Sequence, residues 1–159
     1  VKLIQGDDTI DGLGGDDLIC GGEGNDTLYG GDGNDQIAPG NGDDVVDGGR
    51  GDDSIRSTRG GDDILKGGSG NDYIHGGRGR DKIYGGSGHD HILGNSGDDK
   101  LYGQSGHDLV EGQAGRDKLS GGTGRNILVQ GGASERVRDR WTDRHGYTGP
   151  RGVAVYSDQ

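Results

Sequence analysis

Aliphatic residues recur every nine positions through most of this 159-residue chain. The series begins at Ile10, shifts by one residue between Ile55 and Leu65, and continues without a miss to its last member. A repeat of fixed length is the signature of a solenoid, in which each unit buries its apolar residue against its neighbours. The fourteen members are Ile10, Ile19, Leu28, Ile37, Val46, Ile55, Leu65, Ile74, Ile83, Ile92, Leu101, Val110, Leu119 and Leu128.

A second series runs in register with the first, two positions before each aliphatic residue. It consists of Asp8, Asp17, Asp26, Asp35, Asp44, Asp53, Asp63, Asp72, Asp81, Asp90, Asp99, Asp108, Asp117 and Asn126. A glycine stands two positions before each of these. Ordinary turn chemistry explains scattered Asp-Gly pairs, because Asp bonds its own backbone in turns. It does not explain thirteen carboxylates in one register, so we expect this series to have a further role.

The repeat has the consensus Gly-Gly-x-Gly-x-Asp-x-aliphatic-x, which is clearest at residues 21–29 and 76–84. This pattern resembles the nonapeptide array of the RTX (repeats-in-toxin) family, and the resemblance covers roughly residues 5–132. It implies a parallel β-helix whose turns bind Ca²⁺ between neighbouring coils, through this Asp and through main-chain carbonyls.

The spacing predicts how each unit folds. Nine residues divide into a six-residue glycine-rich turn and a three-residue strand with one side chain inward. Two units make an 18-residue coil, so fourteen units make about seven coils. We therefore expect an all-β fold, a right-handed parallel β-roll (a β-helix solenoid), over residues 1–132, with an irregular turn at 56–60. Residues 133–159 leave the repeat and are predicted to form a short C-terminal cap.

The interior of such a roll is thin. Leu, Ile and Val together number 28, Phe is absent, and 40 residues are Gly. Chains this poor in apolar residues and rich in charge are generally disordered. We therefore expect the chain to be largely unfolded unless a bound cation stabilises it.

The registered carboxylates predict where cations bind. Residues 18 apart should stack on one side of the roll, which gives one column from Asp8 to Asp117 and another from Asp17 to Asn126. Carboxylates and carbonyls suit Ca²⁺, which takes six to eight oxygens, better than Mg²⁺, which demands octahedral geometry. Zinc and copper favour nitrogen or sulfur. All fourteen residues of the series are therefore predicted metal ligands for about 8–12 Ca²⁺ ions, with weak sites at the irregular turn and at Asn126.

Composition disfavours other classes of function. The net charge of −11 argues against nucleic acid and anionic membranes. No apolar run is long enough to span a bilayer. The glycines follow the nine-residue frame without the Gly-Lys-Ser/Thr of a phosphate loop, and no nucleophile elbow is present. We expect no catalysis and no small-molecule substrate. The lone Cys20 excludes a disulfide framework within the chain.

Two further patterns leave alternatives open. His89 and His107 share a repeat position 18 residues apart, where they are either solvated turn residues or a zinc- or pH-sensing pair. Tyr29, Tyr84 and Tyr102 follow an aliphatic residue and point outward, which suits a sugar- or partner-binding surface but also simple strand propensity.

The C-terminal segment and the charge gradient bear on assembly. Residues 152–156 alternate like a strand, and the segment 133–159 is either a cap on the last coil or an interaction segment. Residues 1–55 carry a net charge of −12 and residues 136–159 one of +2. This gradient, together with open strand edges, favours head-to-tail stacking into filaments.

We expect a secreted, extracellular or cell-surface calcium-binding module with a structural role, which folds on binding Ca²⁺. The alternative is a calcium-dependent secretion or folding domain of a larger exported enzyme, toxin or adhesin. Ice or surface adhesion is a third, weaker interpretation, because the outward turn positions form no regular file of Thr or Asn. The chain starts at Val1 without a recognisable signal peptide, and we expect it to be trimmed or processed.

Overall fold

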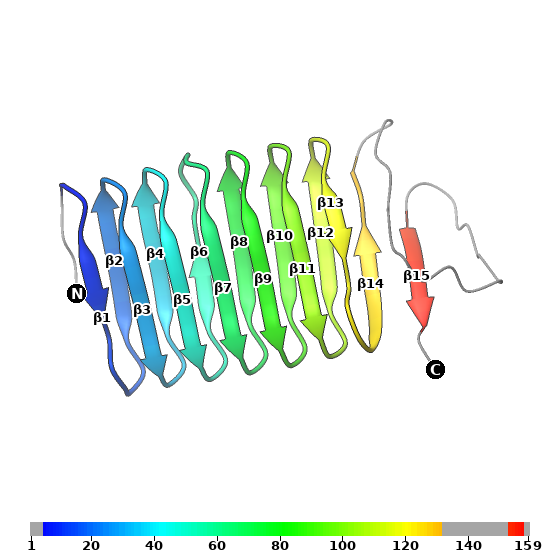
Figure 1. The fold of residues 1–159 in the computed structure, drawn as a ribbon, viewed down its shortest axis with the longest axis horizontal. Coiled ribbons are helices and arrows are strands. Elements are labelled where there is room, and N and C mark those ends of the chain that lie inside the picture. Colours follow the sequence, from blue (N-terminus) through cyan, green and yellow to red (C-terminus); the bar gives the residue numbers. More distant parts are fainter. Residues whose placement is uncertain (1–4, 132–152, 158–159) are drawn as a thin grey trace.

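The computed structural model describes residues 5–131 and 153–157, and within them all regular structure is β-strand. Fourteen strands, two per coil, stack into a solenoid of about seven coils (Figure 1). The all-β solenoid predicted from the nine-residue repeat is confirmed. The described residues contain no helix that could cross a membrane.

The two halves of every coil belong to two different sheets. Odd-numbered strands form a seven-stranded parallel sheet: β1 (Thr9–Asp11), β3 (Thr27–Asp32), β5 (Val45–Arg50), β7 (Ile64–Ser69), β9 (Lys82–Ser87), β11 (Lys100–Ser105) and β13 (Lys118–Ser120). Even-numbered strands form the other: β2 (Leu18–Glu23), β4 (Gln36–Asn41), β6 (Ser54–Arg56), β8 (Tyr73–Arg78), β10 (His91–Ser96), β12 (Leu109–Ala114) and β14 (Arg125–Val129).

The core is a double ladder of aliphatic side chains between the sheets. Ile92, for example, is in register with Ile74 on one side and Val110 on the other. All fourteen residues of the aliphatic series are buried, none more than 5% exposed, and they form a single cluster. The aliphatic series therefore identified the core from the sequence.

Most strands are longer than the three residues expected. β2, for example, has six residues, because Gly22 and Glu23 continue the ladder opposite Gly40 and Asn41. The glycines permit this close approach: a Cβ on Gly40 would lie 2.0 Å from the carbonyl oxygen of Gly22. The turn that remains is correspondingly short, and it carries the registered Asp.

The extra residue of the repeat lies just after β6. Arg56 is still in register with His75, and the Ser57 N–H donates to the His75 carbonyl at 2.9 Å. Regular pairing then stops and returns as an isolated bridge between Gly60 and Arg78. The insertion is thus absorbed within one turn, and the next strand, β7, resumes the frame.

The last strand runs against the others. β15 (Val153–Ser157) pairs antiparallel with β14, with Val155 opposite Ile127 in the backbone register. The strand predicted from the alternation at 152–156 is therefore present, and it covers the outer edge of the even-numbered sheet. The rest of the predicted cap, 133–152 and 158–159, lies outside the described residues.

Candidate metal sites between the coils

One side-chain oxygen of each registered residue from Asp26 to Asn126 links two successive coils. Oδ1 of Asp26 accepts a 2.9 Å hydrogen bond from the backbone N–H of Asp8, and Oδ1 of Asp44 accepts one from Asp26. Twelve such bonds, all 2.8–3.0 Å long, run up the two sides of the roll. The two predicted columns of stacked side chains are therefore present in the fold.

The second carboxylate oxygen, Oδ2, is buried in nearly every coil and has no hydrogen-bond partner. This holds for Asp17, Asp26, Asp35, Asp44, Asp53, Asp63, Asp72, Asp81, Asp90, Asp99, Asp108 and Asp117. Buried polar atoms in proteins are normally paired, and an unpaired carboxylate oxygen is especially costly. A positive charge beside these twelve atoms would offset this cost.

The glycine two positions after the buried aliphatic residue leaves a space, called here the glycine cradle, beside ten of these twelve oxygens; the exceptions are Asp44 and Asp63. A Cβ on Gly30 would lie 2.3 Å from Asp35 Oδ2 and 2.4 Å from the carbonyl oxygen of Gly48, one coil further on. At Gly48 the corresponding distances are 2.4 Å to Asp53 Oδ2 and 2.5 Å to the Gly67 carbonyl. A carboxylate oxygen and a carbonyl oxygen thus approach the same point from adjacent coils.

These donors suit a hard cation. All of them are oxygens, as Ca²⁺ prefers, and a carbonyl of one coil faces a carboxylate of another. Among the described residues, no group of three or more His, Cys, Asp or Glu side chains is arranged so that these side chains alone could hold a metal ion. A cation would therefore draw on main-chain carbonyls as well as on carboxylates, as the resemblance implied.

Burial strongly perturbs the registered carboxylates. It raises the pKa of Asp81 from 3.8 to about 8, opposed by the Asp63 N–H and helped by the charges of Asp63 and Asp99. Burial likewise raises the pKa of Asp72 to about 7. For Asp44, Asp53, Asp90 and Asp99 it raises the pKa to about 6. Without a cation, these side chains therefore hold a proton up to a higher pH than an exposed Asp does.

The ends of the two columns differ from the middle. Asp8 and Asp17, in the first coil, are only half-buried, whereas the registered Asp residues from Asp26 onward are at most 4% exposed. Asn126 accepts the Asp108 N–H at 2.8 Å through its amide oxygen, so it keeps the inter-coil bond without a charge. At the irregular turn, Asp63 is as deeply buried as its neighbours, although Ser57 stands where most repeats have glycine.

A second ladder, which the repeat consensus did not predict, runs along the outside of the turns. In most repeats, the residue just before the registered Asp accepts the backbone N–H of its equivalent in the next coil; Asp62 Oδ1, for instance, binds the Arg80 N–H at 2.8 Å. The exceptions are Arg80 and Arg116. The acceptors are Asp7, Asp16, Asn25, Asn34, Asp43, Asp52, Asp62, Asn71, His89, Asp98 and His107. An excess of Asn, Asp and His at this position was the available signal.

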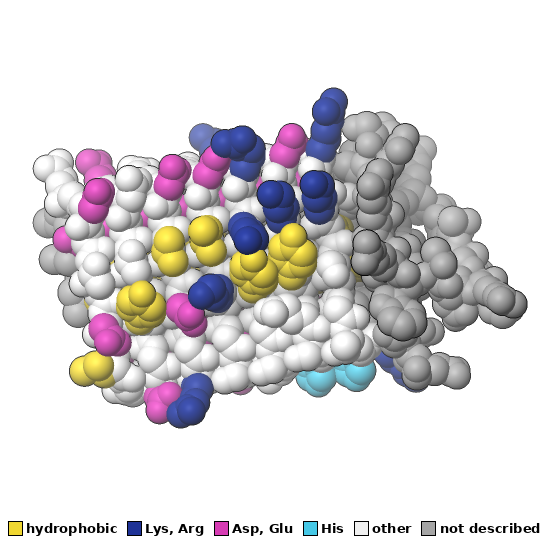
Figure 2. Space-filling view, in the orientation of Figure 1, with side chains coloured by type: hydrophobic (Ala, Val, Ile, Leu, Met, Phe, Trp, Pro, Cys, Tyr) yellow, Lys and Arg dark blue, Asp and Glu magenta, His cyan; other side chains and the backbone are white. Residues whose placement is uncertain are grey.

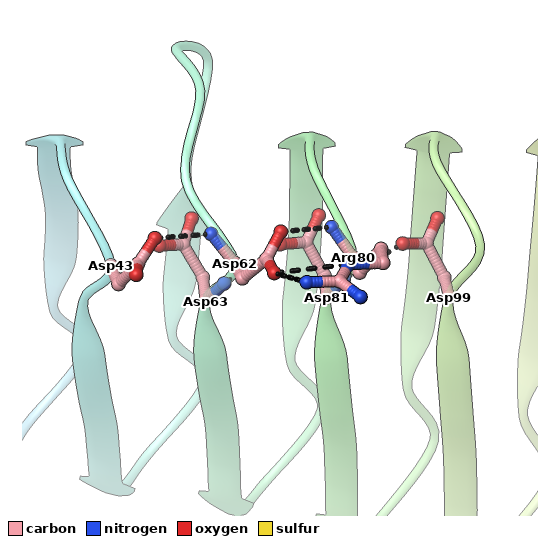
Figure 3. A network of polar contacts seen from close by, with 6 residues as sticks. All are labelled: Asp43, Asp62, Asp63, Arg80, Asp81 and Asp99. Atoms are coloured by element: carbon pink, nitrogen blue, oxygen red, sulfur yellow. Dashed lines mark hydrogen bonds and ion pairs between the residues drawn. The ribbon is translucent and has the colours of Figure 1, made fainter.

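Figure 3 shows both ladders side by side. Asp43 and Asp62 belong to the outer ladder, and Asp63, Asp81 and Asp99 to the inner one. Arg80 cannot accept a hydrogen bond, and its guanidinium instead binds Asp62 Oδ2, with Nε at 3.1 Å. The outer ladder is exposed, and its hydrogen bonds connect the turns of successive coils.

Residues of the histidine and tyrosine patterns stack in pairs in the fold. The rings of His89 and His107 stack with centroids 5.0 Å apart, and each Nδ1 accepts a backbone N–H from the next coil. Tyr84 and Tyr102 stack at 5.1 Å on the odd-numbered sheet. The histidines therefore have a structural role in the outer ladder, while the contacts leave the role of the tyrosines open.

A model of the RTX calcium-binding nonapeptide repeat matches the sequence in four copies, over residues 5–37, 21–55, 57–92 and 93–128. Together the copies cover well over half of the chain and coincide with the stacked coils. No curated protein matches the sequence.

Proposed function

The chain belongs to the RTX calcium-binding nonapeptide repeat family, and we propose that it is a structural module that folds and becomes rigid when it binds calcium. Repeats of this family bind calcium. The proposed ligands are the registered residues from Asp8 to Asn126, with main-chain carbonyls of the adjacent coils, for about 8–12 ions. The observation that carries the proposal is the row of buried, unpartnered Oδ2 atoms.

The chain's own residues prepare the site. The bond from a neighbouring N–H to Oδ1 fixes the carboxylate of each Asp, as in Asp99, whose Oδ1 binds the Asp81 N–H at 2.8 Å. Oδ2 is thereby left in the glycine cradle, away from water. Bound calcium supplies the missing positive charge there. Since the cradle spans two coils, only the folded chain offers it, and calcium stabilises the fold by mass action.

This linkage suits an exported protein, and RTX repeat proteins are typically exported. Extracellular calcium modules bind with Kd values near ~0.1–1 mM. We propose that the chain is largely unfolded in the calcium-poor cytoplasm and folds on binding calcium outside the cell, in the extracellular space or at the cell surface. Its role there is structural rather than catalytic.

The proposal also includes self-association of the chain. Among the described residues, β1 and β2 at one end and β13 at the other have no neighbour on their outer edges. Open edges of parallel sheets can pair with another chain, and the acidic N-terminal part can meet the basic C-terminal part. Electron microscopy in calcium tests this: head-to-tail filaments support it, and only monomers at high concentration exclude it.

The calcium proposal is tested by circular dichroism during a calcium titration, with ions counted by mass spectrometry of the folded protein. We expect a coil spectrum in EDTA at neutral pH and a cooperative change to β-structure near millimolar calcium. A compact β-roll that persists after complete chelation at neutral pH would overturn the proposal.

A further inference from the structure

All four lysines in the described residues lie on the odd-numbered sheet. Lys82, Lys100 and Lys118 are the first residues of β9, β11 and β13, and they are direct Cα partners across the ladder. We refer to these three as the lysine row. The equivalent positions of the even-numbered sheet, Tyr73, His91 and Leu109, contain no lysine. The lysines of the described residues are therefore concentrated on one face.

The positive charges of the lysine row have few ion-pair partners among the described residues. Lys82 Nζ lies 5.2 Å from the centre of the Tyr84 ring. Among the described residues, neither Lys100 nor Lys118 forms an ion pair, whereas Lys66 of the same sheet pairs with Asp47. Like charges directly opposite each other in a sheet are destabilising. A ligand with several negative charges would relieve this repulsion.

The lysine row borders an open groove of about 480 Å³. Arg80, Arg116 and four turn aspartates complete its lining. Two of these aspartates, Asp81 and Asp99, are proposed calcium ligands, and Asp62 is bound by Arg80. Once calcium is bound, the groove is therefore positively charged. Figure 2 shows Lys and Arg side chains gathered beside hydrophobic ones on one face of the roll.

Aromatic residues flank the row two positions further along the strands. Tyr84 and Tyr102 stack at 5.1 Å with an interplanar angle of 17°, so they form a rigid pair parallel to the row. Tyrosine combines an apolar ring with a hydroxyl that donates and accepts hydrogen bonds. This combination suits sugars, whose rings carry both hydroxyls and apolar C–H faces.

We propose that the lysine row, with Arg80, Arg116 and the tyrosine pair, binds a linear acidic polysaccharide that runs along the solenoid axis. Successive lysines stand one strand spacing apart, about 4.8 Å, which is close to the length of one sugar residue. Phosphates of one strand of duplex DNA advance about 3.4 Å along the helix axis while they wind around it, so they fit a straight row less well. The net charge of −11 also opposes duplex DNA. The proposal rests on the folded roll.

The experiment measures binding by calorimetry in saturating calcium. The probes are a size-fractionated oligogalacturonate, which carries carboxylates, and dextran sulfate, which carries sulfates. Unsulfated dextran, random-sequence duplex DNA and vesicles of phosphatidylserine and phosphatidylcholine are the comparison ligands. Lys82→Gln/Lys100→Gln/Lys118→Gln is the test variant. Arg50→Gln/Arg56→Gln/Arg125→Gln loses the same charge away from the row and is its matched control.

We expect one of the two acidic polysaccharides to bind, and the lysine variant to bind it at least about tenfold more weakly, a loss of about 1.4 kcal/mol. The control variant should bind as the unmodified chain does, and added salt should weaken binding. Equal binding by the lysine variant would overturn the proposal, since it would indicate bridging by calcium alone. Tighter binding of DNA, vesicles or neutral dextran, or no binding of either acidic probe, would overturn it as well.

A folding measurement separates this proposal from the calcium proposal. The lysine variant should reach β-structure at the same or a lower calcium concentration, because it loses the repulsion within the row. Lost binding in a variant that folds normally then reports on the groove. Failure of the unmodified chain to fold in response to calcium would instead count against the proposed function.

Discussion

The backbone N–H of Asp63 donates a 3.0 Å hydrogen bond to Oδ1 of Asp81, while Oδ2 of the same carboxylate is buried without a partner (Figure 3). The two oxygens of one side chain therefore have separate tasks. Oδ1 joins two coils and fixes the side chain, and Oδ2 lies where its charge is unfavourable unless a cation is present. Under the proposed function, the buried Oδ2 charge lowers the stability of the metal-free fold and raises that of the calcium-bound fold.

Asp81→Asn should separate these two tasks. The amide oxygen can still accept the Asp63 N–H, as the oxygen of Asn126 accepts the Asp108 N–H at 2.8 Å. The charge at Oδ2 is lost, so we expect more residual structure in EDTA but a higher calcium midpoint. Each lost site removes about 1.4 kcal/mol of stability at calcium ten times above Kd. Chelator and calcium titrations followed by circular dichroism measure both effects.

Asp47→Asn is the control for this charge change, because Asp47 lies outside the registered series, points outward on β5 and pairs with Lys66 across 3.4 Å. It should leave the calcium midpoint and the ion count unchanged. An Asp81→Asn protein with the unmodified chain's midpoint and ion count would show that Asp81 is not a ligand.

Gly48→Ala should close one cradle. The backbone of Gly48 is outside the left-handed region, so alanine is conformationally acceptable there. The new methyl group would, however, lie 2.4 Å from Asp53 Oδ2 and 2.5 Å from the Gly67 carbonyl oxygen. We expect the loss of one ion by mass spectrometry and a raised calcium midpoint.

The matched control is Gly14→Ala, whose nearest neighbour across the coils would be the Asp32 carbonyl oxygen at an ordinary 3.5 Å. It should bind the full number of ions. The natural sequence offers the same comparison, because Pro39 and Ser57 stand where other repeats have the cradle glycine. The sites beside Asp44 and Asp63 should therefore fill last, and equal occupancy at low calcium would argue against the cradle.

The sequence pattern was sufficient to predict the core and the inner ladder of registered Asp residues, because both follow from the same nine-residue period. Once Ile92 is assigned inward, residues 18 apart must stack, and Asp90 must face the turns of its neighbours. Strand length could not be read in the same way. Gly22 extends β2 because its backbone pairs with Gly40, and glycine conveys no side-chain pattern that would reveal such pairing.

The outer ladder and the lysine row needed the three-dimensional register. Asn71 and His89 are different residue types, and only the fold shows that both accept a backbone N–H from the next coil. Lys82 and Lys100 already stand 18 residues apart in the sequence. The sequence does not show that Arg80 and the Tyr84–Tyr102 pair lie beside these lysines, because these residues come together only when the coils stack.

Stability without calcium should fall as pH rises. A carboxyl group whose pKa is higher in the folded chain holds its proton more tightly there, so its contribution to stability is full below the ordinary pKa of 3.8. It is lost as the pH rises through the folded pKa, about 7 for Asp72 and about 8 for Asp81. In EDTA we therefore expect more β-structure near pH 4 than near pH 8.

Calcium binding should show the opposite dependence. The ion displaces the proton from Oδ2, so the calcium concentration needed for folding should decrease as the pH rises over the same range. Calcium titrations at several pH values, followed by circular dichroism, measure this midpoint. A midpoint independent of pH between about 5 and 8 would mean that the buried carboxyl groups do not take part in binding.

Removal of residues 132–159 distinguishes the two interpretations of the C-terminal segment. In the complete chain β15 pairs with β14, where Val153 is opposite Val129, and so covers the edge of the even-numbered sheet. If the segment is a cap, its removal uncovers that edge, and sedimentation in calcium should show larger assemblies than the full chain forms. If it is an interaction segment, removal should instead reduce assembly. Calcium-induced folding, measured by circular dichroism, should survive in either case because Asp8 to Asn126 remain, and its loss would show that β15 is required for the roll to form.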